Sequence, residues 1–293
     1  MDAAAFHAQR RFAETSSGRI AYITHGNGPP ALLLHGVPLN GFHWRHVIER
    51  VGDLRSCIAP DLLGLGYTVP AEGQEISFTA QARMVGELLD SLGLDQVDLV
   101  GNDSGGAIAQ IFAATHPERV LTLTLTNCDV HDHWPPAALA RTLEAARAGV
   151  LADGFRRQLE QPSSARSPNR LGAGYADPFA PTDEAVRVYL EPLLSSHDRI
   201  RQLNEYFLNF DNAQTVAIEE QLRSLTVPTL IVWALDDVFF DIASARWLRD
   251  TIPGVVGLVE VPEAKLFFPE DRPDALVRSL RELWAGTAAA IPS

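Results

Sequence analysis

The sequence has few cysteines and few positive charges. Its 293 residues include two cysteines, Cys57 and Cys128, which are too few for a disulfide framework and fit a reducing compartment. With 24 lysine and arginine residues against 37 aspartate and glutamate residues, the formal net charge is −13. A chain this acidic cannot depend on counterion release from phosphates or on attraction to anionic lipids. We therefore expect neither nucleic acid nor a membrane among its partners.

Long apolar runs are also absent, and so are histidines after position 197. No apolar run reaches the ~18–20 residues that cross a bilayer. The first residues lack the basic-then-apolar order of a signal peptide. These absences predict a cytoplasmic globular protein. The last of the nine histidines is His197, so no histidine is available as a catalytic base beyond it.

Short apolar runs alternate with helical patterns in the first part of the chain. The runs at 31–36, 56–61, 97–102 and 120–127 are bounded by Gly, Pro, Asn or Asp and are typical of strands. Residues 79–94 carry apolar side chains at helical spacing. Because strands that alternate with helices form parallel sheets covered on both faces, the sequence predicts a doubly wound, mostly parallel α/β sheet.

A helical segment interrupts this alternation. Helical patterns with polar, Pro- and Gly-containing breaks extend from Trp134 to about Thr226. Strand patterns then return at 227–237 and 255–262, before a final helix at 273–286. We interpret the segment as a helical cap inserted after the sixth strand, over the carboxyl ends where ligands bind. The expected division is a first part of the core at 1–130, the cap at 131–215 and a second part of the core at 216–293.

The segment VDLVGNDSGGAIAQIFA predicts a nucleophile elbow, a tight turn between a strand and a helix. Such a turn needs small residues two before and two after the nucleophile, because larger side chains there would collide. Asp103 has Gly101 and Gly105 as these flanks, whereas Ser104 lacks a small residue on one side. The elbow therefore presents a carboxylate and not a hydroxyl. The alternative is an ordinary strand-to-helix turn in which Asp103 caps the helix.

Two backbone N–H groups are expected beside this carboxylate. In LLLHGVPLNGFHW, a strand ends in a loop that offers the N–H of Val37, and the start of the next helix offers that of Ser104. Two such donors form an oxyanion hole. We interpret His35 as a histidine that holds this loop and not as a base.

A further pair of acids follows a later strand. In IVWALDDVFF, Asp236 and Asp237 stand at the end of an apolar run. One of them could orient a catalytic base, as the acid of a catalytic triad does. The alternative is a pair of surface carboxylates.

These motifs occur in an order that resembles the α/β-hydrolase fold: HGVP, PDLLGLG, GNDSGG, IVWALDD and then VPEAKLFFPEDRPD. The Asp-centred elbow is similar to that of the haloalkane dehalogenase and epoxide hydrolase branch. The resemblance implies that Asp103 attacks carbon and forms an alkyl-enzyme ester, which a His–acid pair then hydrolyses. It also implies that Asp237 is the acid and that the N–H groups of Val37 and Ser104 form the oxyanion hole. It implies no cofactor.

The sequence departs from that branch at three positions. Dehalogenases commonly place Trp after the nucleophile and Asn after the His-Gly pair as halide donors, where this chain has Ser104 and Val37. Leu266 occupies the position of the catalytic histidine. Because leucine can neither accept nor donate a proton, an ester on Asp103 would form and then persist.

A replacement base is available in the loop after the strand at 120–127. His131 is flanked by Asp129 and Asp132, and His133 follows. If this loop lies near Asp103, His131 could be a relocated base with its own orienting acid. The alternatives are hinge residues of the cap or a metal site, for which adjacent ligands on a tight loop are poorly directed. We expect no metal.

Substrate contacts are expected from the cap and from the apolar loops around it. Cap tyrosines donate to the epoxide oxygen in epoxide hydrolases, and Tyr206 is the candidate for that role here. Trp134 and Phe240, with its neighbour Phe239, are expected to line an apolar pocket, and Leu266 to form part of its wall.

Three hypotheses for the function follow from these residues. The first is a hydrolase that acts through Asp103 on a small or medium apolar electrophile, either an epoxide or an activated carbon–halogen bond. The second is an ester or lactone hydrolase, which rests on analogy with the fold alone. The third is a ligand-binding protein or an enzyme for elimination or isomerisation, suggested by Leu266. In each case the expected partner is a small apolar molecule, and the sequence leaves the oligomeric state open.

Overall fold

The computed structural model describes residues 1–288, with side chains described to residue 286. Nine strands form one sheet in the order β1-β2-β4-β3-β6-β7-β8-β9, with β5 paired to β2. From β4 to β9 every neighbouring pair in this order is parallel, whereas β1 and β4 are antiparallel to β2. The strands are β1 (Arg10–Thr15), β2 (Gly18–His25), β3 (Pro30–Leu34), β4 (Ser56–Pro60), β5 (Val69–Pro70), β6 (Val97–Asp103), β7 (Val120–Cys128), β8 (Thr229–Ala234) and β9 (Val255–Val261).

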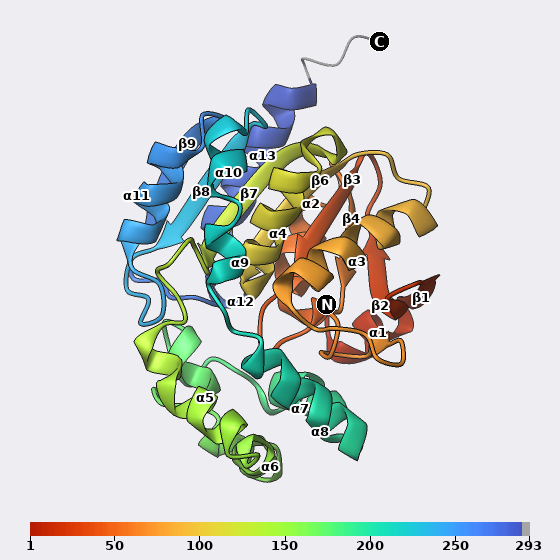
Figure 1. Ribbon diagram of the computed structural model, residues 1–293, viewed down its shortest axis with the longest axis vertical. Coiled ribbons are helices and arrows are strands. Elements are labelled where there is room, and N and C mark those ends of the chain that lie inside the picture. The colour runs from red at the N-terminus through yellow and green to blue at the C-terminus, as the bar shows by residue number, and fades with distance from the viewer. Residues whose placement is uncertain (289–293) are drawn as a thin grey trace.

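Helices cover this sheet and form a separate group below it (Figure 1). Helices α3 and α4 contact each other on one face, and α2 contacts α13. The helices are α1 (Ala3–Ala8), α2 (Arg45–Val51), α3 (Phe78–Ser91), α4 (Ser104–Thr115), α5 (Ala140–Arg147), α6 (Leu151–Glu160), α7 (Asp183–Leu194), α8 (His197–Leu208), α9 (Ala213–Val216), α10 (Glu219–Ser224), α11 (Ile242–Thr251), α12 (Phe268–Asp271) and α13 (Asp274–Ala288), with short 3-10 turns such as η5 (Leu171–Gly174).

The architecture confirms the predicted doubly wound, mostly parallel sheet. Strands β3, β4, β6 and β7 fall on the four predicted apolar runs. All seven residues of β6 are buried, as expected for a central parallel strand covered on both faces. The antiparallel hairpin of β1 and β2 lies in a stretch for which the sequence predicted no strand. Polar side chains at the beginning and end of both strands shorten their apolar runs, which weakens the apolar signal.

The helical segment follows β7, which is the sixth strand when the two-residue β5 is left aside. Helices α5, α6, α7 and α8 lie together, apart from the sheet (Figure 1). By contrast, α9 and α10 contact α4 of the core. The division of the chain at residues 131 and 215 stays a prediction. None of the helices in residues 1–288 combines the length and apolar composition that crossing a bilayer requires.

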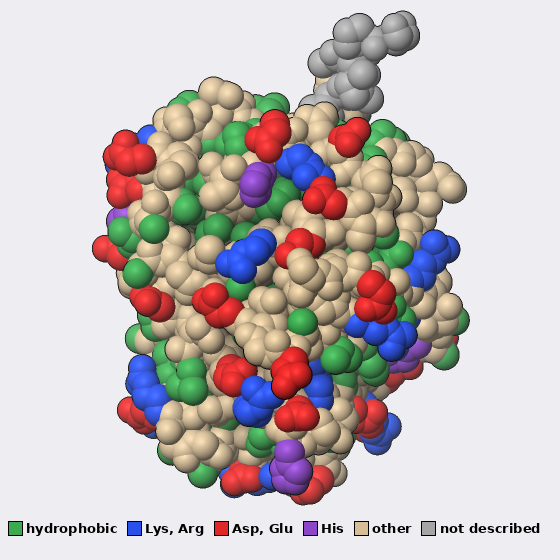
Figure 2. All heavy atoms as spheres, turned by 45° about the vertical axis from the view of Figure 1, so that its right-hand side comes forward, with side chains coloured by type: hydrophobic (Ala, Val, Ile, Leu, Met, Phe, Trp, Pro, Cys, Tyr) green, Lys and Arg blue, Asp and Glu red, His purple; other side chains and the backbone are tan. Residues whose placement is uncertain are grey.

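The surface carries acidic side chains over the whole visible face, interspersed with arginines (Figure 2). They do not gather into a single acidic patch on that face. On this face the negative charge is therefore spread over the surface and is not concentrated at one site.

A buried ionic cluster joins the cap to the core at Glu270 of α12. Its carboxylate accepts hydrogen bonds from Arg45 Nη2 (2.7 Å), the Tyr175 hydroxyl (2.8 Å) and the Tyr189 hydroxyl (2.7 Å). Burial alone would raise the pKa of Glu270, but Arg45 and His43 outweigh it and hold that pKa at about 2. Because both tyrosines come from the cap segment and Arg45 from α2, the cluster fixes one segment against the other.

We expect Glu270→Gln to lower the free energy of unfolding at pH 7 by about 3–5 kcal/mol, because Arg45 then stays buried without its counter-charge. Denaturant unfolding followed by circular dichroism measures this change. Glu14→Gln is the matched control, since the Glu14 side chain is 80% exposed and its ion pair is worth less than about 1 kcal/mol.

The difference in stability between the wild type and Glu270→Gln should depend on pH. The folded-state pKa of Glu270 lies below its ordinary value of 4.5, so its stabilising contribution is present above pH 4.5. That contribution is lost as the pH falls through 2. The difference between the wild type and Glu270→Gln should therefore narrow over this range, and a constant difference would contradict the assignment.

Candidate active site

The turn between β6 and α4 holds Asp103 in a strained backbone conformation. Asp103 has φ 56° and ψ −134°, a region that residues with a side chain rarely adopt. A Cβ on Gly101 would lie 2.6 Å from the Gly105 carbonyl oxygen, and one on Gly105 would lie 2.4 Å from the Leu34 carbonyl oxygen. Backbone therefore passes against backbone on both sides of the turn, which explains why both flanks are glycine.

The carboxylate of Asp103 points into the loop after β3. Val37 donates its backbone N–H to Asp103 Oδ2 at 2.9 Å. A Cβ on Gly36 would lie 2.0 Å from the same oxygen, so only glycine lets the carboxylate approach this loop. His35 holds the loop, because its Nδ1 donates to the Gly36 carbonyl (2.8 Å) and its Nε2 accepts the Leu62 N–H (3.1 Å).

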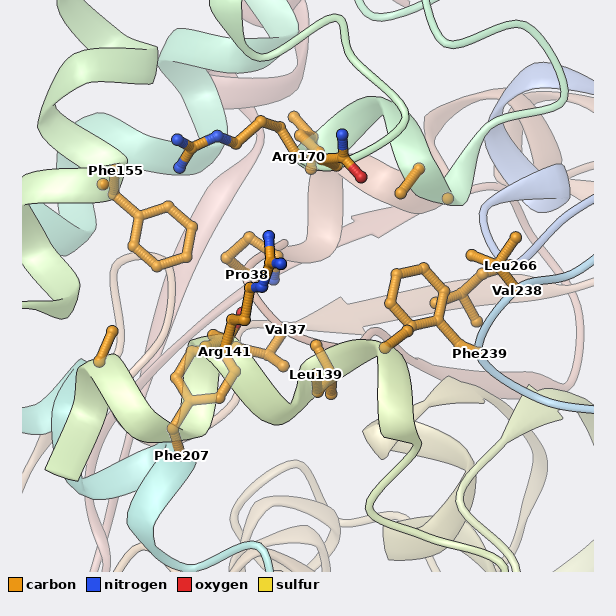
Figure 3. Close-up of a pocket in the computed structure, with 18 of the residues that line it drawn as sticks. Val37, Pro38, Leu139, Arg141, Phe155, Arg170, Phe207, Val238, Phe239 and Leu266 are labelled. Carbon is orange, nitrogen blue, oxygen red and sulfur yellow. The ribbon is translucent and has the colours of Figure 1, made fainter.

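Asp103 opens into a cavity of about 890 Å³ between the sheet and the cap. Leu266, Val238 and Phe239 lie on one side of it (Figure 3). The opposite side is formed by cap residues, among them Phe155. The carboxylate thus faces a mainly apolar space of the size that holds a small or medium organic ligand.

Asp237 is the less exposed of the two acids after β8. Its Oδ2 accepts a hydrogen bond from Asn127 Nδ2 (2.9 Å), and its Oδ1 accepts the Phe239 N–H (3.1 Å). Asp237 is partly buried, whereas Asp236 is exposed. Leu266 lines the cavity with 3% of its surface exposed, and its carbonyl accepts a hydrogen bond from Asn102 (3.0 Å). A hydrocarbon side chain, and not an imidazole, thus forms this part of the cavity wall.

Comparison with known proteins agrees with this arrangement. The family model described as alpha/beta hydrolase fold matches residues 29–271. The chain belongs to the α/β-hydrolase fold family. This hydrolase is 31% identical over 286 residues to haloalkane dehalogenase 2 of Mycobacterium tuberculosis, with 94% of each chain covered.

Two further proteins are similar to this chain over most of its length. The cis-3-alkyl-4-alkyloxetan-2-one decarboxylase of Shewanella oneidensis is 27% identical over 295 residues, which cover 95% of this chain and 89% of that protein. The structure of the epoxide hydrolase CorEH without ligand superposes with a TM-score of 0.78 at 22% identity, covering 94% of this chain and 98% of that one. The hydrolase belongs to the branch that contains haloalkane dehalogenases and epoxide hydrolases.

Asp103 of this hydrolase interacts electrostatically with two further carboxyl groups, Asp237 and Asp129. Burial raises the pKa of Asp103 to about 7; the N–H groups of Val37 and Ser104 offset part of that effect, and the charge of Asp237 adds to it. Burial also raises the pKa of Asp237 to about 6. Asp129 follows Cys128, the residue paired with Asp103 in the sheet.

The carboxyl group of Asp129 has no hydrogen-bond partner among the described residues. Burial and the charge of Asp103 raise the pKa of Asp129 well above its usual range, which favours its neutral form. The raised pKa values of Asp103 and Asp129 mean that the two carboxyl groups are not both readily ionised at neutral pH.

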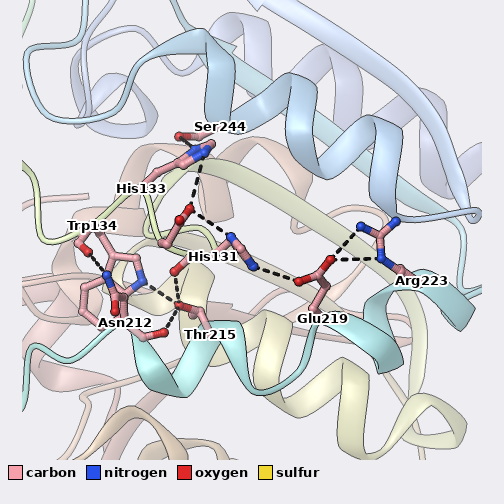
Figure 4. Close-up of polar contacts among 9 residues, drawn as sticks. His131, His133, Trp134, Asn212, Thr215, Glu219, Arg223 and Ser244 are labelled. Atoms are coloured by element: carbon pink, nitrogen blue, oxygen red, sulfur yellow. Dashed lines mark hydrogen bonds and ion pairs between the residues drawn. The ribbon is translucent and has the colours of Figure 1, made fainter.

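His131 lies away from the cavity, which corrects the expectation that it acts as a relocated base. Its Nδ1 bonds to Asp132 (2.9 Å) and its Nε2 to Glu219 (2.9 Å), as Figure 4 shows. Its ring also stacks on Trp247 with the ring centroids 4.6 Å apart. Both ring nitrogens are engaged by carboxylates, and His131 is not among the described residues that line the cavity with Asp103.

Two predicted substrate contacts are also engaged elsewhere, whereas Phe240 and Leu266 do line the cavity. Trp134 is not among the lining residues: its indole N–H donates to Thr215 Oγ1 (2.6 Å) and its ring stacks on Phe78. Tyr206 is fully buried, and its hydroxyl is bonded to Ser104 Oγ at 2.8 Å. Tyr206 therefore reaches the nucleophile turn, but through Ser104 and not from the cavity wall.

The basic residues of the cavity were not predicted from the sequence. Arg141, Arg157 and Arg170 line it, each from a different part of the cap. No motif marks them, because arginines on amphipathic helices are ordinary solvent-facing residues until the helices are placed. The unpaired state of Asp129 was likewise hidden, since it depends on which groups surround the side chain.

We expect Asp103→Asn to stabilise the protein by about 2–4 kcal/mol at pH 7, because folding raises the pKa of Asp103 from its ordinary value to about 7 and so opposes its ionisation. The sign follows directly: the ionised form is disfavoured in the folded state, so the wild type loses stability relative to the variant as the pH rises from 4 to 7. Thermal unfolding at several pH values measures the difference. Asp236→Asn, at an exposed neighbour of the site, should show no such trend.

Proposed function

We propose that Asp103 is a nucleophile that attacks an electrophilic carbon of a small or medium apolar substrate, an epoxide or an activated carbon–halogen bond. The observation that carries the proposal is the placement of Asp103 on a strained turn, with one carboxylate oxygen held by the Val37 N–H and the group open to an apolar cavity. This arrangement orients a carboxylate toward a ligand, as covalent catalysis requires.

The first step forms an ester without any proton acceptor. One oxygen of Asp103 attacks carbon, and the bond to the epoxide oxygen or to halide breaks with its electron pair. The oxygen bound to the Val37 N–H becomes the ester carbonyl, already polarised by that donor. An epoxide alkoxide takes its proton from an acid or from water, whereas halide needs none.

An epoxide or a bromide suits this site better than a chloroalkane. The positions from which related dehalogenases bind halide hold Ser104 and Val37, and the Ser104 hydroxyl is occupied by Tyr206. A leaving chloride would lack both side-chain donors. The substrate must therefore bring strain or a good leaving group.

The second step, hydrolysis of the ester, lacks its usual base. Water must lose a proton as it attacks the ester carbonyl, and Leu266 occupies the position of the catalytic histidine in the branch that this chain resembles. The ester on Asp103 should consequently accumulate.

Incubation with 1,2-epoxyoctane should add the mass of the whole epoxide to the intact protein as a hydroxyalkyl ester. Incubation with 1-bromooctane should add one octyl group with loss of bromide. Both adducts should be stoichiometric and persistent. Mass spectrometry with peptide mapping should place that mass on Asp103. Asp103→Asn should show no adduct, and the matched variant Asp236→Asn should react like the wild type. Absence of any adduct and of any substrate consumption, over a series of epoxides and bromides, would contradict the proposal.

Leu266→His should convert this stoichiometric reaction into turnover, because it returns a base between Asp237 and the ester. Diol or alcohol should be released, and the adduct should vanish within minutes to hours. Leu266→Gln, polar but not basic, should leave the adduct in place. Rapid multiple turnover by the wild type, with no gain in Leu266→His, would show that another group already serves as base.

A second candidate reaction is favoured by the same leucine. A cis-oxetan-2-one, the substrate class in the name of the Shewanella relative, decomposes without activated water. Asp103 attacks C4, the saturated ring carbon bonded to the ring oxygen. The bond between C4 and that oxygen breaks, which releases a carboxylate. The bond between C3 and the carboxylate carbon then breaks, and CO₂ leaves. The electron pair of that bond forms the alkene between C3 and C4. Asp103 leaves C4 as a carboxylate and takes the electron pair of the ester C–O bond. No proton is transferred at any point.

With a cis-3,4-dialkyloxetan-2-one, the wild type should accordingly release CO₂ and an alkene over many turnovers, detected by gas chromatography. Asp103→Asn should be inactive, and Leu266→His should offer no advantage. Formation of the β-hydroxy acid in place of the alkene would assign the protein to lactone hydrolysis, and no reaction would exclude this candidate.

A further inference from the structure

The charged side chains around the cavity are mostly basic, although the chain as a whole is acidic. The described lining residues include one carboxylate, Asp103, and three arginines, Arg141, Arg157 and Arg170. The complete chain has a formal net charge of −13. The cavity thus has the opposite sign of charge to the protein that encloses it, which attracts anions into it.

These arginines come from three separate elements of the cap. Arg141 is in α5, Arg157 is in α6, and Arg170 immediately precedes η5. Figure 3 shows Arg141 and Arg170 around the part of the cavity that is away from Leu266, with Phe155 and Phe207 nearby. Convergence from three elements is a tertiary feature and not a property of one basic helix face.

None of the three forms an ion pair within the part of the chain that the structure describes. The Nε of Arg157 donates to the Asp153 carbonyl at 3.3 Å, and no side-chain hydrogen bond of Arg141 or Arg170 occurs among the same residues. Nearby arginines of the cap do have acidic partners: Arg156 pairs with Asp153 (3.0 Å). Carboxylates are therefore available in the cap, but not to the cavity arginines.

Apolar side chains line the same cavity as these arginines and Asp103. Leu139, Phe155 and Phe207 belong to the cap side, and Val238 and Phe239 to the loop after β8. A ligand that fills the cavity would therefore meet guanidinium groups, hydrocarbon and the Asp103 carboxylate together.

We propose that Arg141, Arg157 and Arg170 form a subsite for an anionic head group, a carboxylate or a phosphate, on an apolar chain whose reactive carbon faces Asp103. Guanidinium groups bind both anions through paired N–H donors. The placement of the reactive carbon rests on the function proposed for Asp103. The anion subsite itself rests on the cap arginines.

Calorimetric titration with decanoate, decyl phosphate and the neutral decanamide tests the subsite without any reaction at Asp103. We expect at least one anion to bind the wild type about tenfold or more tightly than decanamide. The comparison of decanoate with decyl phosphate identifies the preferred head group. Because all three arginines are exposed, anion binding should weaken as the salt concentration rises.

Substitutions locate the effect. Arg141→Gln, Arg157→Gln and Arg170→Gln should each weaken binding of the preferred anion by about 3-fold to 10-fold and leave decanamide unchanged. Arg147→Gln is the matched control, since Arg147 belongs to the same helix as Arg141 but does not line the cavity.

Three results would overturn the subsite. The first is equal affinity for decanamide and both anions, and the second is no binding of any of the three. The third is a loss of anion affinity in Arg147→Gln equal to that in the cavity variants. These results are independent of adduct formation. If the protein binds the anions but is never alkylated, the proposed subsite stands and the proposed role of Asp103 is wrong. If the protein is alkylated but does not prefer the anions, the role of Asp103 stands and the subsite is wrong.

Discussion

The backbone turn at Asp103 is the constraint on which the rest of the site depends. A positive φ on a residue with a side chain is costly, so the surrounding structure must hold it. That support comes from close backbone packing: Gly105 lies against the Leu34 carbonyl, and Gly36 lies against the Asp103 carboxylate. Parallel pairing of β3 with β6 sets this contact, because Leu34 is opposite Gly101 in the register. The sheet thus determines where the carboxylate points.

The site combines a carboxylate held by the Val37 N–H with a hydrocarbon wall at Leu266. Burial and neighbouring charge keep the pKa of Asp103 near neutrality, and Asp129 adds a second acid without a hydrogen-bond partner among the described residues. Such strain and desolvation lower stability and are typical of functional sites. The reaction proposed for Asp103 uses these features, because attack on carbon by a carboxylate needs no proton acceptor, whereas attack by water does. The anion subsite proposed for the cap arginines would add a preference for the sign of the ligand's charge.

Much of the core could be predicted from the sequence because its signals are local. A continuous apolar run such as β6 reflects burial on both faces, and the glycine spacing around Asp103 reflects collisions within a few residues. The predictions that failed all needed distant partners. His131 is flanked by acids in sequence, but its ring bonds to Glu219, which is 88 residues away. Trp134 is aromatic and near the cap, but Thr215 and Phe78 hold it outside the cavity.

The sequence by itself determined the order of the main parallel strands, the carboxylate at the elbow and the lack of a histidine at position 266, since each depends on residue identity or on short-range spacing. Only the tertiary structure decided which groups meet: Asp237 with Asn127, Tyr206 with Ser104, and three cap arginines around one cavity. The physical reason is that a side chain on a helix or loop has no defined partner until packing of the whole chain fixes its direction and removes it from water.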